Sequence, residues 1–91
     1  RELLWEACLQ ESLMVLDKGE MEVESDPKSA DWKVAIAGVL KKRHLCANGW
    51  LSAQLNMGAT SAVSRNVARM FSGERSSAFR FYRKINSRIN S

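Results

Sequence analysis

The chain has 91 residues, of which 45% are hydrophobic, 14 are basic and 10 are acidic, for a net charge of +4. This length accommodates one small domain with a modest core. Its apolar runs are far shorter than the ~18 residues that span a bilayer, and no charged-then-apolar leader precedes a cleavage site, so we expect a soluble, cytoplasmic protein with no membrane partner.

Charge is divided unevenly along the chain. Residues 1–31 carry 3 basic and 9 acidic side chains, a net charge of −6, whereas residues 32–91 carry 11 basic and 1 acidic, a net charge of +10. A segregated basic half is typical of proteins that neutralise the phosphates of nucleic acids. The acidic half leaves three interpretations open: a solvated face, a segment that repels nucleic acid and so orients the domain, or a surface that pairs with the basic half of a second copy in a homodimer.

The first predicted element is an acidic N-terminal helix within residues 1–18. Its apolar stripe is formed by Trp5, Leu9, Leu13 and Leu16, which recur at helical spacing. Residues 20–25 alternate acidic and apolar side chains, which is the period of a strand. Six residues without a nearby pairing partner nevertheless favour a loop or a helical turn.

The next helix is predicted to start at Asp26-Pro27, where a capping side chain precedes a proline at the first helical position. Apolar residues between positions 32 and 40 supply its buried face. The helix is predicted to end in a basic run, Lys41, Lys42 and Arg43. Basic side chains suit the negative end of a helix and can also contact phosphate.

A short helix over residues 49–56 is predicted to follow, with Asn48 as its N-cap. Met57-Gly58 end this helix, because glycine adopts a positive φ at low cost. A second helix begins soon after the glycine. Two short helices joined by a glycine turn indicate a helix-turn-helix, and we expect its core to extend over residues 26–72.

The second helix of this pair is predicted to start at Thr60 or Ser61. Its apolar residues follow the i, i+4, i+7, i+8 spacing of one buried stripe: Val63, Val67, Met70 and Phe71. The opposite face combines small polar side chains with two guanidinium groups. That combination suits the major groove, where arginine pairs with guanine and small residues allow close approach.

The candidate DNA-contacting residues fall into three groups. The residues expected to reach base edges are Ser61, Arg65 and Arg69. Those expected to contact the sugar-phosphate backbone near the helix N-terminus are Thr60 and Ser64. The residues expected to bind the DNA backbone from the preceding helix are Lys41, Lys42 and Arg43, together with the C-terminal arginines.

A basic C-terminal helix is predicted over residues 74–91, after Gly73 ends the preceding helix and with Ser76 or Ser77 as its cap. Its apolar stripe comprises Ala78, Tyr82, Ile85 and Ile89. The basic residues beside this stripe are Arg75, Arg80, Arg83, Lys84 and Arg88. The whole chain is therefore predicted to be one all-α domain of about five helices.

The sequence offers no catalytic or metal-binding constellation. The single histidine, His44, excludes a pair of histidines that would hold a metal, and no serine or cysteine lies in a nucleophile motif. Cys8 and Cys46 are far apart among apolar neighbours, which predicts buried thiols and no disulfide or zinc site. We therefore expect this chain to have no enzyme activity, no cofactor, no metal and no small-molecule substrate.

Three segments in order resemble a known family. They are Asp26-Pro27-Lys28, residues 33–37, and residues 48–58 followed by Ala62-Val63-Ser64-Arg65. Together they resemble the C-terminal region of REP-associated tyrosine transposases and related transposase-like proteins, in which a pattern Trp-Ile/Leu-Ala-x-x-Leu-x-Met-Gly precedes a helix containing Val-Ser. The matching residues are Trp50, Leu51, Leu55, Met57, Gly58, Val63 and Ser64. His44-Leu45 departs from the pattern, since relatives commonly have two threonines there.

The resemblance covers roughly residues 26–71 and implies a DNA-binding domain of a protein involved in DNA transposition. Members of the family carry their chemistry in an upstream domain, with a metal-binding histidine pair and a tyrosine that attacks single-stranded DNA. This sequence lacks that motif, so the resemblance implies recognition of an element end or a repeated hairpin, without nuclease activity. Two alternatives remain: a protein-interaction or dimerisation module that uses the acidic first helix, and RNA binding through the arginine-aromatic tail.

Overall fold

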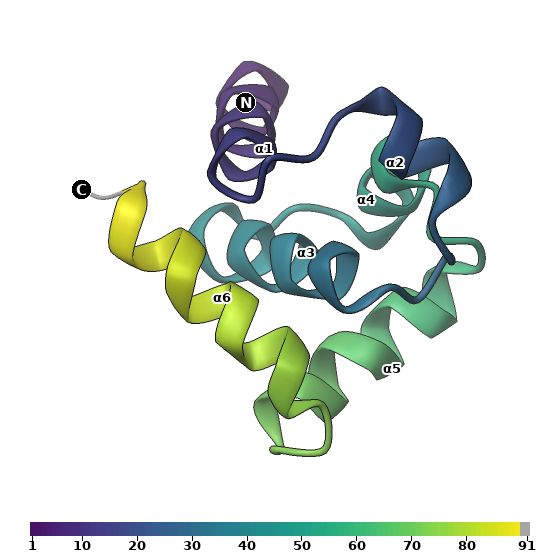
Figure 1. Ribbon diagram of the computed structural model, residues 1–91. Helices are drawn as coiled ribbons and strands as arrows, with labels where there is room; N and C mark the ends of the chain where they lie inside the picture. Colours follow the sequence, from purple (N-terminus) through teal and green to yellow (C-terminus); the bar gives the residue numbers. More distant parts are fainter. Residues whose placement is uncertain (90–91) are drawn as a thin grey trace.

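The computed structural model describes residues 1–89, which form six α-helices and no strand (Figure 1). The helices are α1 (Glu2–Val15), α2 (Glu20–Ser25), α3 (Asp31–His44), α4 (Asn48–Leu55), α5 (Thr60–Phe71) and α6 (Ser76–Arg88). The all-α prediction is confirmed, with one helix more than expected. Asn90 and Ser91, the last residues of the predicted C-terminal helix, lie outside the described residues. No helix within residues 1–89 has the length and apolar content needed to cross a membrane.

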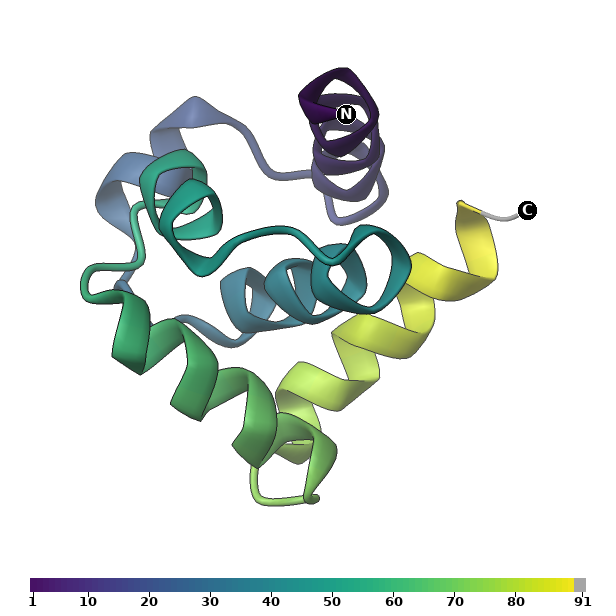
Figure 2. The same cartoon turned by 180° about the vertical axis from the view of Figure 1, so that it is seen from behind.

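Helix α3 lies at the centre of the fold. Figures 1 and 2 show it between α1 on one side and α5 and α6 on the other, and all three pack against it. Every residue from Trp32 to Leu40 is buried, as expected for a helix covered on all sides. A Cβ atom on Gly38 would lie 2.5 Å from the terminal methyl of Met70, so the glycine permits the close approach of α5.

The acidic helix α1 packs against α3 through the predicted stripe. Leu9, Leu13 and Leu16 are buried. Trp5 is half-buried and meets the ring of Trp50 edge-on, with 5.3 Å between the ring centroids. The N-terminal segment is therefore part of the core, although its carboxylates face solvent.

Residues 20–25 form the short helix α2, which agrees with the helical turn that was one of the two alternatives predicted for them. The backbone N–H of Gly19 donates to the carboxylate of Glu22 at 2.8 Å, which satisfies one of the groups left open at the helix start. Glu20 also lies in the first turn, where acidic side chains are favoured by the helix dipole. The alternating pattern of this segment therefore coincides with a helix and not a strand.

Helix α3 begins at Asp31 and not at Pro27, so the predicted start is wrong. Asp26 is the C-cap of α2 in an extended conformation, and its carboxylate accepts a hydrogen bond from the indole N–H of Trp32 at 2.8 Å. A turn follows, in which the Ala30 N–H donates to the Pro27 carbonyl at 3.0 Å. Proline disfavours the helical conformation of the residue before it, so here Asp-Pro separates two helices.

Two other predicted caps are also wrong. Asn48 is the first residue of α4 and not its N-cap, because the carbonyl of Ala47 already accepts the N–H of Leu51 at 3.1 Å. The side-chain oxygen of Asn48 is buried without a hydrogen-bond partner among the described residues. Helix α6 has Arg75 at its N-cap position instead of one of the two serines that follow it, and no side chain caps this end.

A charged side chain lies within the buried surface of α3. Lys33 is fully buried, and its Nζ donates to the carbonyl oxygens of Val23, Asp26 and Asn56 at 2.8, 3.2 and 3.4 Å. These carbonyls belong to the ends of α2 and α4, where helix carbonyls lack partners within their own helix. Burial lowers the pKa of Lys33, and the charge of Asp26 opposes this shift. Lys33 therefore connects α2 and α4 to α3.

Both cysteines are buried free thiols, as predicted. Burial raises the pKa of Cys46 to about 11 and raises the pKa of Cys8 above its ordinary value. A hydrogen bond from Ser12 partly opposes the shift at Cys8. Thiols with raised pKa values carry little thiolate at neutral pH and are weak nucleophiles.

Candidate nucleic-acid interface

Helices α4 and α5 are joined by residues 56–59, which reverse the chain (Figure 2). Asn56 ends α4 in the left-handed conformation, with φ +53°, and Gly58 has φ +81°. The hydroxyl of Ser52 donates to the Gly58 carbonyl, and the N–H of Met57 donates to the Ser52 carbonyl at 3.0 Å. Glycine favours positive φ, so Gly58 suits this connection.

The inner face of α5 agrees with most of the predicted stripe. Val63, Val67 and Met70 are buried. Phe71 is 37% exposed, so its predicted burial is wrong: it lies at the end of α5 and lines the rim of a surface hollow. Its ring meets that of Tyr82 edge-on, with 5.0 Å between the centroids. Asn66 is also buried on this face, a position that an apolar pattern does not indicate.

The outer face of α5 carries the candidate DNA-contacting residues. All of them are exposed: Thr60, Ser61, Ser64, Arg65 and Arg69. Among residues 1–89, Arg65 forms no ion pair, whereas Arg69 Nε lies 3.1 Å from a carboxylate oxygen of Glu74. Both members of that pair are more than half exposed, and exposed ion pairs contribute little free energy. Arg69 is therefore partly neutralised but accessible.

Lys41 and Lys42 lie beside α5. They line a hollow of about 370 Å³ between the end of α3 and α5, which we call the α3–α5 hollow. Its other lining residues are Leu45, Ser64, Val67, Ala68 and Phe71. The ammonium of Lys42 lies 5.0 Å from the ring centroid of Phe71, within range of a cation–π interaction. The structure therefore brings two of the three lysine and arginine residues at the end of α3, Lys41 and Lys42, next to the candidate recognition helix.

Arg43 points to a different neighbour. Its Nε donates to the side-chain oxygen of Asn86 on α6 at 3.0 Å, so it connects α3 to the C-terminal helix. The side chain of Arg43 is exposed. Unlike the two lysines before it, Arg43 does not line the α3–α5 hollow.

Arg75 holds helices together. Its guanidinium donates to the Asp31 carboxylate at 2.6 Å, to the Ser29 carbonyl at 2.7 Å and to the side-chain oxygen of Asn66 at 3.0 Å. Its side chain is only 18% exposed. These bonds join the start of α6 to α3 and α5, so Arg75 has a structural role that was not predicted from the sequence. The remaining basic residues of α6 are exposed: Arg80, Arg83, Lys84 and Arg88.

The aromatic residues of α6 pack against the core and are half-buried. The rings of Phe79 and Tyr82 are stacked, with 5.4 Å between their centroids. Phe81 also packs against the core. Base stacking needs an open ring face, so this packing disfavours the prediction of RNA binding through the arginine-aromatic tail.

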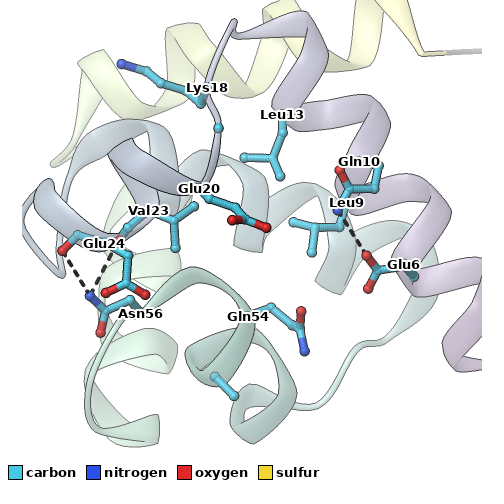
Figure 3. Close-up of a pocket in the computed structure, with 12 residues that line it drawn as sticks. Glu6, Leu9, Gln10, Leu13, Lys18, Glu20, Val23, Glu24, Gln54 and Asn56 are labelled. Carbon is cyan, nitrogen blue, oxygen red and sulfur yellow. Dashed lines mark hydrogen bonds between the residues drawn. The ribbon is translucent and has the colours of Figure 1, made fainter.

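A second hollow of about 480 Å³ lies between α1, α2 and α4, away from α5 and α6. Its apolar lining includes Leu9, Leu13 and Val23, and its carboxylates belong to Glu6, Glu20 and Glu24 (Figure 3). Carboxylates repel phosphate, so this side of the domain is unsuited to nucleic acid. The acidic and basic parts of the sequence thus form different surfaces of the folded molecule.

Most residues that carry the resemblance to transposase-like proteins are interior residues of the α4–α5 pair. Leu51, Leu55, Met57 and Val63 are buried, and Ser64 is exposed. The motif therefore describes how these two helices pack more than what they contact. Comparisons of the chain with protein families, with curated proteins and with solved structures find no match, so its function is inferred from the arrangement of its own residues.

Proposed function

We propose that the domain binds double-stranded DNA, with α5 as a recognition helix in the major groove. The observation that carries this proposal is the exposed outer side of α5, where Arg65 lies among small side chains. On the same helix, Ser64 and Ala68 line the α3–α5 hollow together with Lys41 and Lys42. A long forked donor surrounded by small residues reaches base edges while the helix backbone stays close to the groove.

The start of α5 supports a phosphate contact. Its N-cap residue, Ala59, provides no side-chain hydrogen bond, so N–H groups of the first turn lack a capping partner. Thr60 and Ser61 are exposed at the same end and can donate hydroxyl hydrogen bonds. A helix N-terminus with such donors attracts anions, and a DNA phosphate there would fix the orientation of α5.

The distribution of charge supports the same orientation. Lys41 and Lys42 flank α5, and exposed basic residues line α6, whereas the acidic hollow lies among α1, α2 and α4. Phosphates attract the basic side and repel the acidic side, so the field of the molecule turns α5 toward DNA during approach.

The resemblance to transposase-like proteins supports a narrower proposal. Within it, the domain recognises an element end or a repeated hairpin for DNA transposition, while a separate domain performs the chemistry. Trp50, Met57, Gly58 and Ser64 are among the residues behind this proposal. A cytoplasmic location belongs to the same proposal.

The test is a binding titration by fluorescence anisotropy with a selected duplex, a random duplex, hairpin DNA and RNA at several salt concentrations. DNA binding should weaken linearly on a log–log salt plot, because neutralised phosphates release counterions. Arg65→Ala should weaken binding to the selected duplex by about 1–3 kcal/mol and reduce sequence preference, whereas Lys42→Ala should weaken all duplexes about equally. Lys18→Ala serves as the control, because Lys18 lines the acidic hollow between α1, α2 and α4.

Three results would contradict this proposal. Unchanged affinity and preference in Arg65→Ala would exclude α5 as the helix that recognises bases. Tighter binding to RNA than to any DNA would favour the arginine-aromatic tail. Salt-independent or undetectable binding to every nucleic acid would favour a protein-interaction module.

A further inference from the structure

The exposed large apolar residues of the described chain lie in two regions of opposite charge. Four belong to the acidic helices α1 and α2: Leu3, Leu4, Met14 and Met21. The other two, Leu45 and Phe71, line the basic α3–α5 hollow. Exposed apolar residues that gather inside charged surroundings are typical of protein interaction sites.

Helix α1 has an apolar stripe on its solvent side. At about 100° per residue, Leu3, Ala7 and Met14 lie within about 40° of one another, on the side opposite to the buried residues Leu9 and Ser12. Leu3 is 85% exposed and Met14 is 78% exposed. The buried stripe already attaches α1 to α3, so intramolecular packing does not explain the second one. We call this surface the α1 outer face, formed by Leu3, Leu4, Ala7, Glu11 and Met14.

The α3–α5 hollow complements this face in both polarity and charge. Leu45, Val67 and Phe71 provide apolar contacts, and Lys41 and Lys42 provide positive charge. The α1 outer face presents apolar side chains with Glu11 among them. At the scale of the chain, residues 1–31 have net charge −6 and residues 32–91 have net charge +10, so two copies attract each other when opposite parts meet.

We propose that the α1 outer face of one molecule docks in the α3–α5 hollow of a second copy, with Met14 against the apolar lining and Glu11 toward Lys42. The two surfaces are different, so the contact is heterologous. Each added copy leaves one α1 outer face and one hollow free at the ends of the assembly, which allows growth beyond a dimer. DNA competes with this contact, because both use Lys41 and Lys42.

The first test is sedimentation equilibrium of the full chain without nucleic acid, at concentrations from about 10 µM to about 1 mM, the range for weak contacts. The average mass should rise above the 10.2 kDa monomer with concentration and fall when NaCl is added. The double variant Leu3→Ser/Met14→Ser should remain monomeric. Met21→Ser, which removes an equally exposed apolar side chain from α2, should associate like the parent.

A mixing experiment then tests which surfaces meet. Lys42→Glu alters the hollow and leaves α1 intact, whereas Leu3→Ser/Met14→Ser alters α1 and leaves the hollow intact. Each variant should be monomeric alone, and an equimolar mixture should form a pair that stops at a dimer, because the pair contains a single intact interface. Circular dichroism of each variant checks that it is folded.

Two outcomes would overturn this inference. One is a parent chain that stays monomeric up to about 1 mM, a concentration at which weak contacts are detected. That result would mean that something other than a second copy covers the α1 outer face. The other is a parent chain that associates while the mixed variants stay monomeric, which would mean that α1 pairs with another surface. Neither outcome bears on DNA binding, since no nucleic acid is present in either experiment.

Discussion

Replacing Lys33 by methionine should strongly destabilise the domain. Methionine keeps most of the side-chain volume but removes the three hydrogen bonds to the carbonyls of Val23, Asp26 and Asn56. The Val23 carbonyl still accepts a hydrogen bond from the side-chain amide of Asn56 at 3.3 Å. The carbonyls of Asp26 and Asn56 are the two that lose the hydrogen bond from Lys33 with no such second donor. At about 1–3 kcal/mol for each, the two carbonyls cost about 2–6 kcal/mol, and the desolvation cost of the ammonium that is recovered lowers the net loss to about 1–4 kcal/mol.

This loss is easily measured in a domain of 91 residues. At about 4–8 °C per kcal/mol for a domain of this size, it corresponds to a fall in melting temperature of roughly 4–30 °C, which thermal and urea unfolding followed by circular dichroism would detect. Lys28→Met is the matched control, because it removes an exposed positive charge from the same part of the chain and should change stability by less than about 0.5 kcal/mol. Equal melting temperatures for Lys33→Met and Lys28→Met would refute the role assigned to Lys33.

Three further predictions concern stability. Gly58→Ala should lower the free energy of unfolding by about 1 kcal/mol or more, because an alanine at φ +81° is strained and its Cβ would lie 3.1 Å from Lys28. Gly49→Ala is the control, since a Cβ at that position meets open space and should not destabilise the domain. Equal melting temperatures for the two variants would contradict this prediction. Burial raises the pKa of Cys46 from 9.0 to about 11, so this thiol loses its proton at a higher pH in the native state than in the unfolded state. The resulting contribution to stability, about 3 kcal/mol, should be complete below pH 9 and lost as the pH rises toward 11. Urea unfolding of Cys46→Ala should not show this loss. Parallel pH profiles for the parent and the variant would contradict the prediction. Deleting residues 1–25 should expose apolar surface and lower the melting temperature, and an equally stable truncation with tighter DNA binding would indicate instead that the acidic segment masks the DNA surface.

Periodic apolar patterns predicted α1 and α5 well, because each of these two helices buries one face. Leu9 and Leu13 on α1, and Val63 and Met70 on α5, are buried where the spacing places them. Helix starts were harder to predict. Aspartate is a residue type that commonly caps helices, yet the carboxylate of Asp26 accepts a hydrogen bond from Trp32, because the bend after α2 brings the two side chains together.

At the candidate site, the exposure of the side chains was predictable from the sequence, but their ion-pair and hydrogen-bond partners were not. The sequence places Arg65 and Arg69 on the side of α5 away from the core, and both are exposed. That Arg69 pairs with Glu74, and that Arg75 joins three helices, depends on how α5 and α6 meet. The burial of Lys33 was not predictable from the sequence, since a lysine in a helix is ordinarily solvated. Its hydrogen-bond acceptors exist only where the ends of α2 and α4 meet in the folded domain.

The separation of the two faces of α5 has a consequence for how freely its sequence can change. Val63, Val67 and Met70 attach the helix to the domain, while Ser61 and Arg65 project from it into solvent. Substitutions at the projecting positions leave the interior intact, so they should be nearly neutral for folding. A combinatorial library at those positions would therefore consist mostly of folded members, and selection could redirect the domain to new targets without rebuilding its scaffold.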